Sequence, residues 1–182
     1  IKINNSFTST NGKVAGFVFS DNGSTISDSY VKGDLTSTYA SAYGFSEELN
    51  GSTISNCATY GNINTKINAS GFAQTVTNGS ITSSFAYIEF GTLNKGYVSG
   101  FVNSNSGTIT NCYASGKIVK DNYESSVVSG FVNSNSGTID HSFTVVAIMD
   151  GSLTSVGFAR TNSGTLSECY YVYNLTASEH NG

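Results

Sequence analysis

The stretch VSGFVNSNSGTI occurs twice in this chain, at residues 98–109 and at residues 128–139, without a single difference. The Gly-Phe pair inside it recurs along the chain at intervals of 27 to 30 residues. Its copies are Gly16-Phe17, Gly44-Phe45, Gly71-Phe72, Gly100-Phe101, Gly130-Phe131 and Gly157-Phe158. A repeat of this length is typical of solenoids, in which each repeat packs only against its neighbours.

Two further apolar columns follow each Gly-Phe pair. The first stands eight or nine residues after the Phe and comprises Ile26, Ile54, Ile81, Ile109, Ile139 and Leu166. The second stands nine residues further on and comprises Leu35, Ile63, Phe90, Ile118, Ile148 and Leu175. Three columns predict three faces, each built from one short strand and a turn. Coils stacked about 4.8 Å apart would pair their backbones and join the columns into one core.

The sequence therefore predicts an all-β fold, a right-handed parallel β-helix, which is a three-faced solenoid of about seven coils of 27–30 residues. Residues 1–182 are expected to form one β-helix repeat domain, cut from a longer solenoid because the chain begins inside a repeat. A half coil should precede the first pair, with Ile3 and Phe7 matching Ile26 and Tyr30. A β-sandwich is the alternative, but it has no reason to repeat one residue type at this period.

The strand around each Gly-Phe pair presents a conflict. Strict alternation places Val128, Gly130 and Val132 on one side of a strand and Phe131 on the other. A bulge or a corner at the glycine would bring both sets to the core. We expect Phe to point inward, because a stripe of outward-facing rings would be a large apolar surface in water. Rings that faced outward would instead form a binding surface.

The units SGFVNSNSGTITNCYASGKI, at 99–118, and SGFVNSNSGTIDHSFTVVAI, at 129–148, resemble the GLUG motif. This motif is a short repeat of large bacterial cell-surface proteins, including adhesins and some IgA1-specific metallopeptidases. The similarity covers almost the whole chain, although Ala58 replaces the usual aromatic residue and Phe replaces a more usual leucine. The elements of the motif are here Gly100, Phe101, Val102, Asn105, Gly107, Ile109, Cys112, Tyr113 and Gly116. The resemblance implies a β-helical surface or stalk module without catalytic residues, and the chain has no HExxH zinc motif.

Composition indicates a folded domain that does not bind nucleic acid. Hydrophobic residues make up 38% of the chain, charged residues only 11%, and the net charge is −4. The few Lys and Arg are scattered, so no basic field exists that would gather phosphates. No apolar run reaches the length of about 18 residues that a membrane span needs, so we expect no membrane insertion.

An asparagine column is the most regular polar feature. Asn22, Asn50, Asn105, Asn135 and Asn162 each stand four residues before the aliphatic residue of the first column, with Thr77 as the exception. We interpret them as a structural amide ladder at a turn, because Asn accepts left-handed backbone angles and its amide can bond to the coils above and below. The other interpretation is a polar row offered to a ligand.

Tyrosines mark the turn of variable length before each Gly-Phe pair. Tyr39, Tyr43, Tyr97 and Tyr123 fall in this turn and are the candidate ligand-binding residues. Aligned along one edge, their rings could stack on sugars or meet a protein partner. The alternative is that they cover a corner of the core. Of the sequons, those at Asn68 and Asn174 are the candidates for glycosylation if the protein is made by a eukaryote.

Three cysteines share one column. Cys57, Cys112 and Cys169 alternate with serines at the corresponding places of other repeats, namely Ser6, Ser29, Ser84 and Ser142. Successive cysteines are two coils apart, so their Cα atoms should be about 9 to 10 Å from each other, which is too far for a disulfide. We expect free thiols. The spacing also fits no usual metal site, so neither a metal nor a cofactor is predicted.

The sequence suggests a non-catalytic role. His141 and His180 are isolated, and Asp28 and Asp140 share a column but lie four coils apart, so no nucleophilic triad or carboxylate pair is indicated. The first hypothesis is an extracellular surface module that acts as a rigid stalk or adhesin. The alternatives are a self-assembling extracellular filament subunit and a polysaccharide-binding or polysaccharide-cleaving β-helix. The expected partners are a host or cell-surface glycan or protein, or copies of the same chain.

Overall fold

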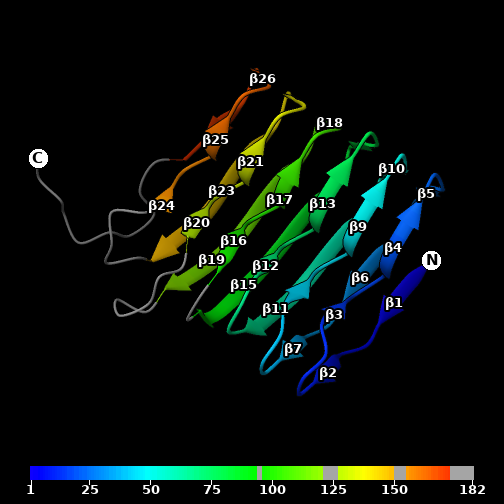
Figure 1. Ribbon diagram of the computed structural model, residues 1–182, viewed down its shortest axis with the longest axis vertical. Coiled ribbons are helices and arrows are strands. Elements are labelled where there is room, and N and C mark those ends of the chain that lie inside the picture. Colours follow the sequence, from blue (N-terminus) through cyan, green and yellow to red (C-terminus); the bar gives the residue numbers. More distant parts are fainter. Residues whose placement is uncertain (94–95, 121–126, 150–154, 173–182) are drawn as a thin grey trace, which may run out of the picture.

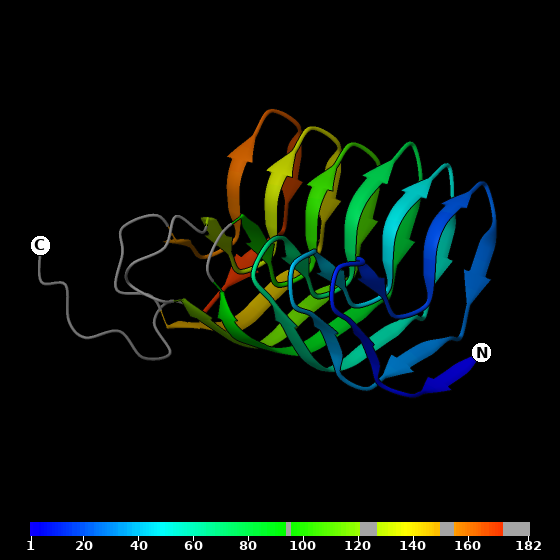
Figure 2. The same ribbon diagram turned by 60° about the horizontal axis from the view of Figure 1, so that its bottom comes forward.

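The computed structural model describes residues 1–93, 96–120, 127–149 and 155–172. These residues form strands and turns only, and all paired strands are parallel and stacked coil upon coil, as Figure 1 shows. The predicted parallel β-helix is confirmed. It has about six turns, because three of its sheets contain six strands each, and not the seven that the repeats had suggested. In Figure 2 the coils follow one another in chain order from β1 to β26.

Each full coil contributes strands to four sheets, which we call B, C, D and A in chain order. Sheet B contains β3 (Val14–Ala15), β8 (Ala42–Tyr43), β12 (Ala69–Ser70), β16 (Tyr97–Ser99), β20 (Val127–Ser129) and β24 (Ser155–Val156). Sheet C contains β4 (Val18–Asn22), β9 (Ser46–Asn50), β13 (Ala73–Thr77), β17 (Val102–Asn105), β21 (Val132–Asn135) and β25 (Ala159–Asn162).

Sheets D and A complete each coil. Sheet D contains β5 (Thr25–Ser27), β10 (Thr53–Ser55), β14 (Ser80–Thr82), β18 (Thr108–Thr110), β22 (Thr138–Asp140) and β26 (Thr165–Ser167). Sheet A contains β1 (Lys2–Asn4), β2 (Phe7–Ser9), β6 (Tyr30–Lys32), β7 (Leu35–Ser37), β11 (Ala58–Thr65), β15 (Phe85–Leu93), β19 (Tyr113–Lys120), β23 (Phe143–Met149) and β27 (Tyr170–Tyr171).

The phenylalanines of the Gly-Phe pairs stack inside the molecule. The ring centroids of Phe101 and Phe131 are 4.9 Å apart, and every other successive pair from Phe17 to Phe158 is 4.5 to 4.9 Å apart. Sheets B and C meet at each Gly-Phe pair, so the predicted corner at glycine exists. Because the chain turns there, Val128, Phe131 and Val132 are all fully buried. The expectation that Phe points inward is confirmed.

The two aliphatic columns also stack in register. The first column lies on sheet D, where Ile54, Ile81, Ile109 and Ile139 are fully buried. The second column lies on sheet A, where Leu35, Ile63, Phe90, Ile118 and Ile148 are in register. Its predicted last member, Leu175, lies outside the described residues. The three predicted faces are therefore present, with the first face bent into sheets B and C.

The N-terminal half coil has a different register from the predicted one. Ile3 pairs with Val31 and Phe7 pairs with Leu35 on sheet A, and not with Ile26 and Tyr30. Phe7 therefore begins the second aliphatic column. The reason is that both predicted and observed alignments place apolar residues four apart, and only the strand pairing distinguishes them. The same shift removes Ser6 from the cysteine column.

The cysteine column is otherwise as predicted. The three thiols are free, and Cys57 and Cys112 are fully buried. Serines of the intervening coils bind the cysteine backbones: the amide of Cys57 donates to Ser84 Oγ at 3.0 Å, and that of Cys112 donates to Ser142 Oγ at 3.2 Å. The column lies in the turn between sheets D and A, where the Sγ atoms of Cys57 and Cys112 are each 3.3 Å from the backbone carbonyl oxygen two residues earlier.

Candidate functional site

Sheets B and C meet in a corner that points toward sheet A. At Gly100, an added Cβ atom would lie 2.0 Å from the carbonyl oxygen of Gly130 and 2.9 Å from a methyl carbon of Val146 on β23. The hydroxyl of Thr144, also on β23, donates to the carbonyl oxygen of Gly130 at 2.9 Å. Only glycine fits so close to a neighbouring backbone. The corner is therefore re-entrant, and a recess lies outside it, between sheets B and C.

Two rows of side chains line this recess. On sheet B, Ala42, Ala69, Val98 and Val128 belong to the core, so the residue that follows each of them points outward. This first row comprises Tyr43, Ser70, Ser99 and Ser129 in successive coils. The second row stands four residues later on sheet C and comprises Glu47, Gln74, Asn103 and Asn133. We call the space between the two rows the corner recess.

Amide groups close the corner recess over its later coils. Asn133 Nδ2 donates to Asn103 Oδ1 at 2.6 Å and to the carbonyl oxygen of Val98 at 3.0 Å. Asn103 Nδ2 likewise donates to Gln74 Oε1 at 2.6 Å and to the carbonyl oxygen of Ala69 at 3.0 Å. The amides thus bridge from sheet C to sheet B. Beneath them the hydroxyls of three serines are buried without a hydrogen-bond partner, at Ser70, Ser99 and Ser129.

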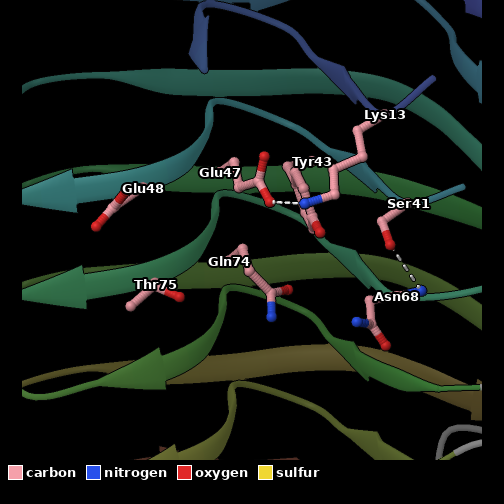
Figure 3. Close-up of a pocket in the computed structure, with 8 residues that line it drawn as sticks. All are labelled: Lys13, Ser41, Tyr43, Glu47, Glu48, Asn68, Gln74 and Thr75. Carbon is pink, nitrogen blue, oxygen red and sulfur yellow. Dashed lines mark hydrogen bonds and ion pairs between the residues drawn. The ribbon is translucent and has the colours of Figure 1, made fainter. Parts of the chain in front are cut away.

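The corner recess is open where its lining changes to larger side chains. A pocket with a volume of about 350 Å³ lies there, across three successive coils. Figure 3 shows Glu47 pointing toward Lys13 beside Tyr43, with Gln74 and Asn68 on the next coil. The full lining comprises Lys13, Ser41, Tyr43, Glu47, Glu48, Asn68, Gln74 and Thr75. Every one of these side chains carries a polar group.

One of the two carboxylates in the pocket is compensated by a cation. Lys13 Nζ forms an ion pair with Glu47 Oε1, and this hydrogen bond raises the pKa of Lys13 above its ordinary value. Glu48 Oε2 accepts a hydrogen bond from Ser20 Oγ at 3.3 Å. Burial raises the pKa of the Tyr43 phenol, so its hydroxyl stays protonated at neutral pH. The pocket therefore offers neutral donors and acceptors, one compensated cation and two carboxylates.

The structure separates the four predicted tyrosines. Tyr43 is only 2% exposed and lines the pocket, whereas Tyr39 and Tyr97 are 63% and 48% exposed. Tyr97 is next to the pocket, because its backbone amide donates to Asn68 Oδ1 at 2.9 Å. Tyr39 lies in the turn that precedes β8, where its amide donates to a backbone carbonyl. Tyr123 lies outside the described residues.

The asparagine column divides into two ladders. Asn22 pairs with Asn50 in register, and Asn50 Nδ2 donates to Asn22 Oδ1 at 3.1 Å on the surface. The other three form a deeper ladder, with Asn105 Nδ2 donating to Asn135 Oδ1 at 2.8 Å and Asn135 Nδ2 donating to Asn162 Oδ1 at 2.7 Å. Both ladders are stacks of amides, as predicted, but they occupy different positions of the coil. The expected left-handed backbone angles are wrong, because each of these asparagines ends a strand of sheet C and none has a positive φ.

The candidate sequons are placed differently. Asn68 lies in the pocket wall, where its Oδ1 is held by the Tyr97 amide. A glycan on Asn68 would therefore stand at the mouth of the pocket. Asn174 lies outside the described residues.

Sequence reasoning missed an aromatic ladder on the outer face of sheet A. The rings of Phe85, Tyr113 and Phe143 stack nearly parallel, with centroids 4.7 and 5.2 Å apart. The signal was the aromatic residue that follows the Cys or Ser of every repeat except at Ala58. Rings stacked in this way cover one another's faces and present their edges to solvent, so we regard the ladder as structural. The amide bridge from Gln74 to Asn133 was missed as well.

The described part of the chain lacks two other kinds of site. It contains no group of three or more His, Cys, Asp or Glu residues placed to hold a metal ion. It also contains no helix long and apolar enough to cross a membrane. Comparisons of the chain with protein-family models, with curated proteins and with solved structures gave no match.

Proposed function

We propose that the chain is a non-catalytic extracellular surface module that acts as a rigid stalk, holding other parts of a larger protein away from a cell. The observation that supports this proposal is the continuity of the stack from coil to coil. Every sheet continues from coil to coil, and the stack of rings from Phe17 to Phe158 connects all the coils that contain a Gly-Phe pair. A solenoid of this kind lengthens one coil at a time and resists bending, because each coil is bonded to both neighbours.

Polar ladders support the stiffness that a stalk needs. The amides of Asn105 and Asn135 are each only 1% exposed and bond directly to the next coil. Such bonds fix the register of neighbouring coils, because a slip by one residue would leave buried amides without partners. The stack is thus held by three kinds of contact: backbone ladders, stacked rings and stacked amides.

We include the absence of catalysis in the proposal because of how the acidic groups are placed. Glu47, the carboxylate deepest in the corner recess, is ion-paired with Lys13. Glu48, the second carboxylate of the pocket, directly follows Glu47 on β9, points away from it in Figure 3, and accepts a hydrogen bond from Ser20 Oγ at 3.3 Å. A glycosidase needs two carboxyl groups that face each other across a sugar. Incubation with neutral polysaccharides should therefore release no reducing ends.

The surface location rests on the repeat itself, through its similarity to the GLUG motif and its low charge. The test is antibody labelling of intact source cells, with lysed cells as the reference. Antibodies against this chain should label intact cells, and external protease should remove the signal. Labelling that appears only after lysis would overturn the extracellular part of the proposal. It would leave the rigid fold unchanged but place the protein inside the cell.

A further inference from the structure

The chemistry of the pocket at the corner recess narrows the class of ligand it can take. Its one cation, Lys13, is paired with Glu47, and Glu48 adds a second carboxylate nearby. Anionic ligands such as phosphates or uronic acids would meet net negative charge there. No aliphatic side chain lines the pocket, and its single aromatic residue, Tyr43, is 2% exposed. Apolar ligands would therefore gain little by entering it.

A cationic ligand would find Glu47 already paired with Lys13, which repels it, so that only Glu48 is left to attract it. The remaining feature of the pocket is a dense set of hydrogen-bonding groups. Asn68 and Gln74 carry amides, which both donate and accept, and the Tyr43 hydroxyl is protonated. The carboxylate of Glu47 can accept further bonds on its second oxygen. Such a set matches a ligand that presents several hydroxyl groups and no charge. The volume of about 350 Å³ is at the lower end for ligand sites, which suits one or two sugar rings.

We propose that this pocket binds a neutral saccharide, with Gln74, Asn68 and Glu47 bonding to its hydroxyls. Tyr97 supplies the second half of the site. Its ring is 48% exposed and has no ring contact among the described residues, unlike the rings of the ladder on sheet A. Its backbone is fixed to the pocket wall by the bond to Asn68. A second sugar ring extending from the pocket can therefore lie against the free face of Tyr97.

Within the described ranges this arrangement of side chains is found at one place, because the repeat is imperfect there. In the two coils that follow Gln74, serines (Ser99 and Ser129) take the position of Tyr43 and asparagines (Asn103 and Asn133) take the position of Gln74. The asparagine amides bridge the corner recess and close it. Asn103 and Asn133 are only 4% exposed as a result. The expected stoichiometry is one saccharide per chain. This inference is independent of the stalk proposal, since a stalk functions with or without a bound sugar.

The test is isothermal titration calorimetry of the whole chain with four neutral trisaccharides: cellotriose, mannotriose, maltotriose and chitotriose. We expect at least one of them to bind with one site per chain. Trigalacturonate, which is anionic, and spermidine, which is cationic, should bind at least tenfold more weakly. No heat of binding from any of the four at 10 mM, or tighter binding of either charged probe, would overturn the proposal.

Variants locate the site. Gln74→Ala and Tyr97→Ala should each weaken binding of the best trisaccharide by about 5- to 10-fold, the effect of losing one polar or stacking contact. Glu89→Gln is the matched control, because Glu89 is exposed on the outer face of sheet A, and it should leave the affinity unchanged. Because Tyr97 is a surface residue, the Tyr97→Ala variant should keep the melting temperature of the wild type. Equal affinity in wild type, Gln74→Ala and Tyr97→Ala would contradict the assignment.

Discussion

Val76 and Asn105 occupy the same register position of neighbouring coils, although one is an aliphatic residue and the other an amide. The exchange follows from a change in length. The first three repeats have nine residues from Phe to the aliphatic residue, and the later three have eight. Val76 is fully buried and belongs to the apolar core, whereas Asn105 fills the equivalent place with an amide that bonds to the next coil. One structural position is thus stabilised in two ways.

The effects of substituting Asn105 and Asn135 on the free energy of unfolding should be strongly coupled. Asn135→Val removes the acceptor of Asn105 Nδ2, so we expect a loss of about 1–3 kcal/mol in the free energy of unfolding. Asn105→Val should cost a similar amount. The double variant should lose less than the sum, because it leaves no buried amide without its partner, and the coupling should be about 0.5–3 kcal/mol. Urea unfolding of the four proteins measures it, and strict additivity would contradict the ladder.

The phenylalanine stack should contribute more than the surface ladder. Phe101→Ala empties a fully buried position between two rings, and we expect it to lower the free energy of unfolding by about 3–5 kcal/mol. Phe143→Ala, in the outer ladder where the ring is 43% exposed, should cost only about 1 kcal/mol. Urea midpoints followed by circular dichroism give both values. Equal losses would show that the two ladders share the core.

The turn between sheets D and A offers a stabilising substitution. Ser83 has a φ of 48°, in the left-handed region, where its counterparts in neighbouring coils, Asn56 and Asn111, have φ values of 51° and 52°. Asn tolerates this region better than Ser, so Ser83→Asn should stabilise the fold by up to about 1 kcal/mol and raise the melting temperature by about 2–4 °C. Asn111→Ser is the reverse control and should lower it. A fall in both variants would contradict this reading of the turn.

The cysteines should differ in reactivity. Burial raises the pKa of Cys112 to about 12, and Cys169 is the least buried of the three. At pH 8 a thiol reagent should therefore label Cys169 in the folded protein, and Cys112 only after unfolding in urea. Fast labelling of Cys112 without urea would show that the column is open to solvent.

Because its pKa is raised, the Cys112 thiol should also make the free energy of unfolding fall at alkaline pH. An unfolded cysteine loses its proton near pH 8.5, whereas folded Cys112 keeps its proton up to about pH 12. Since the folded state holds the proton more tightly, the stabilisation is complete below about pH 8.5 and is lost as the pH rises toward 12. Cys112→Ser should reduce this slope, and Ser84 and Ser142 show that serine fits the column. An unchanged slope would contradict the pKa shift.

The sequence predicts the stack well because its signal is a repeated apolar position. The positions of Phe101, Ile109 and Ile118 are apolar in repeat after repeat. A sequence that repeats its buried positions in this way is compatible with few folds. The alignment of the asparagine column was harder to predict from the sequence. Counting back from the isoleucine aligns Asn50 with Asn105, whereas strand pairing aligns Asn105 with Val76. The change from nine to eight residues after Phe was visible, but it does not say where in the turn the residue is lost.

The pocket could not be predicted from the sequence for a different reason. Tyr43, Gln74 and Lys13 belong to three coils and come together only once the coils are in register. The re-entrant corner depends on how closely Gly100 approaches the carbonyl oxygen of Gly130, which periodicity does not reveal. Tyr43 and Tyr97 are candidates from the sequence because tyrosine in a variable turn is a signal by itself, and their role in binding stays a prediction. Their polar partners in the pocket carried no such signal.

The most direct test of the account is the distance between two spin labels at opposite ends of sheet D. Thr25 and Thr165 are exposed and belong to one row, five coil steps apart through Thr53, Ser80, Thr108 and Thr138. Labels at Thr25→Cys and Thr165→Cys, with the native cysteines replaced by serine, should give one narrow distance near 24 Å by double electron–electron resonance. A broad distribution, or a distance beyond about 35 Å, would show that the coils do not form a rigid stack.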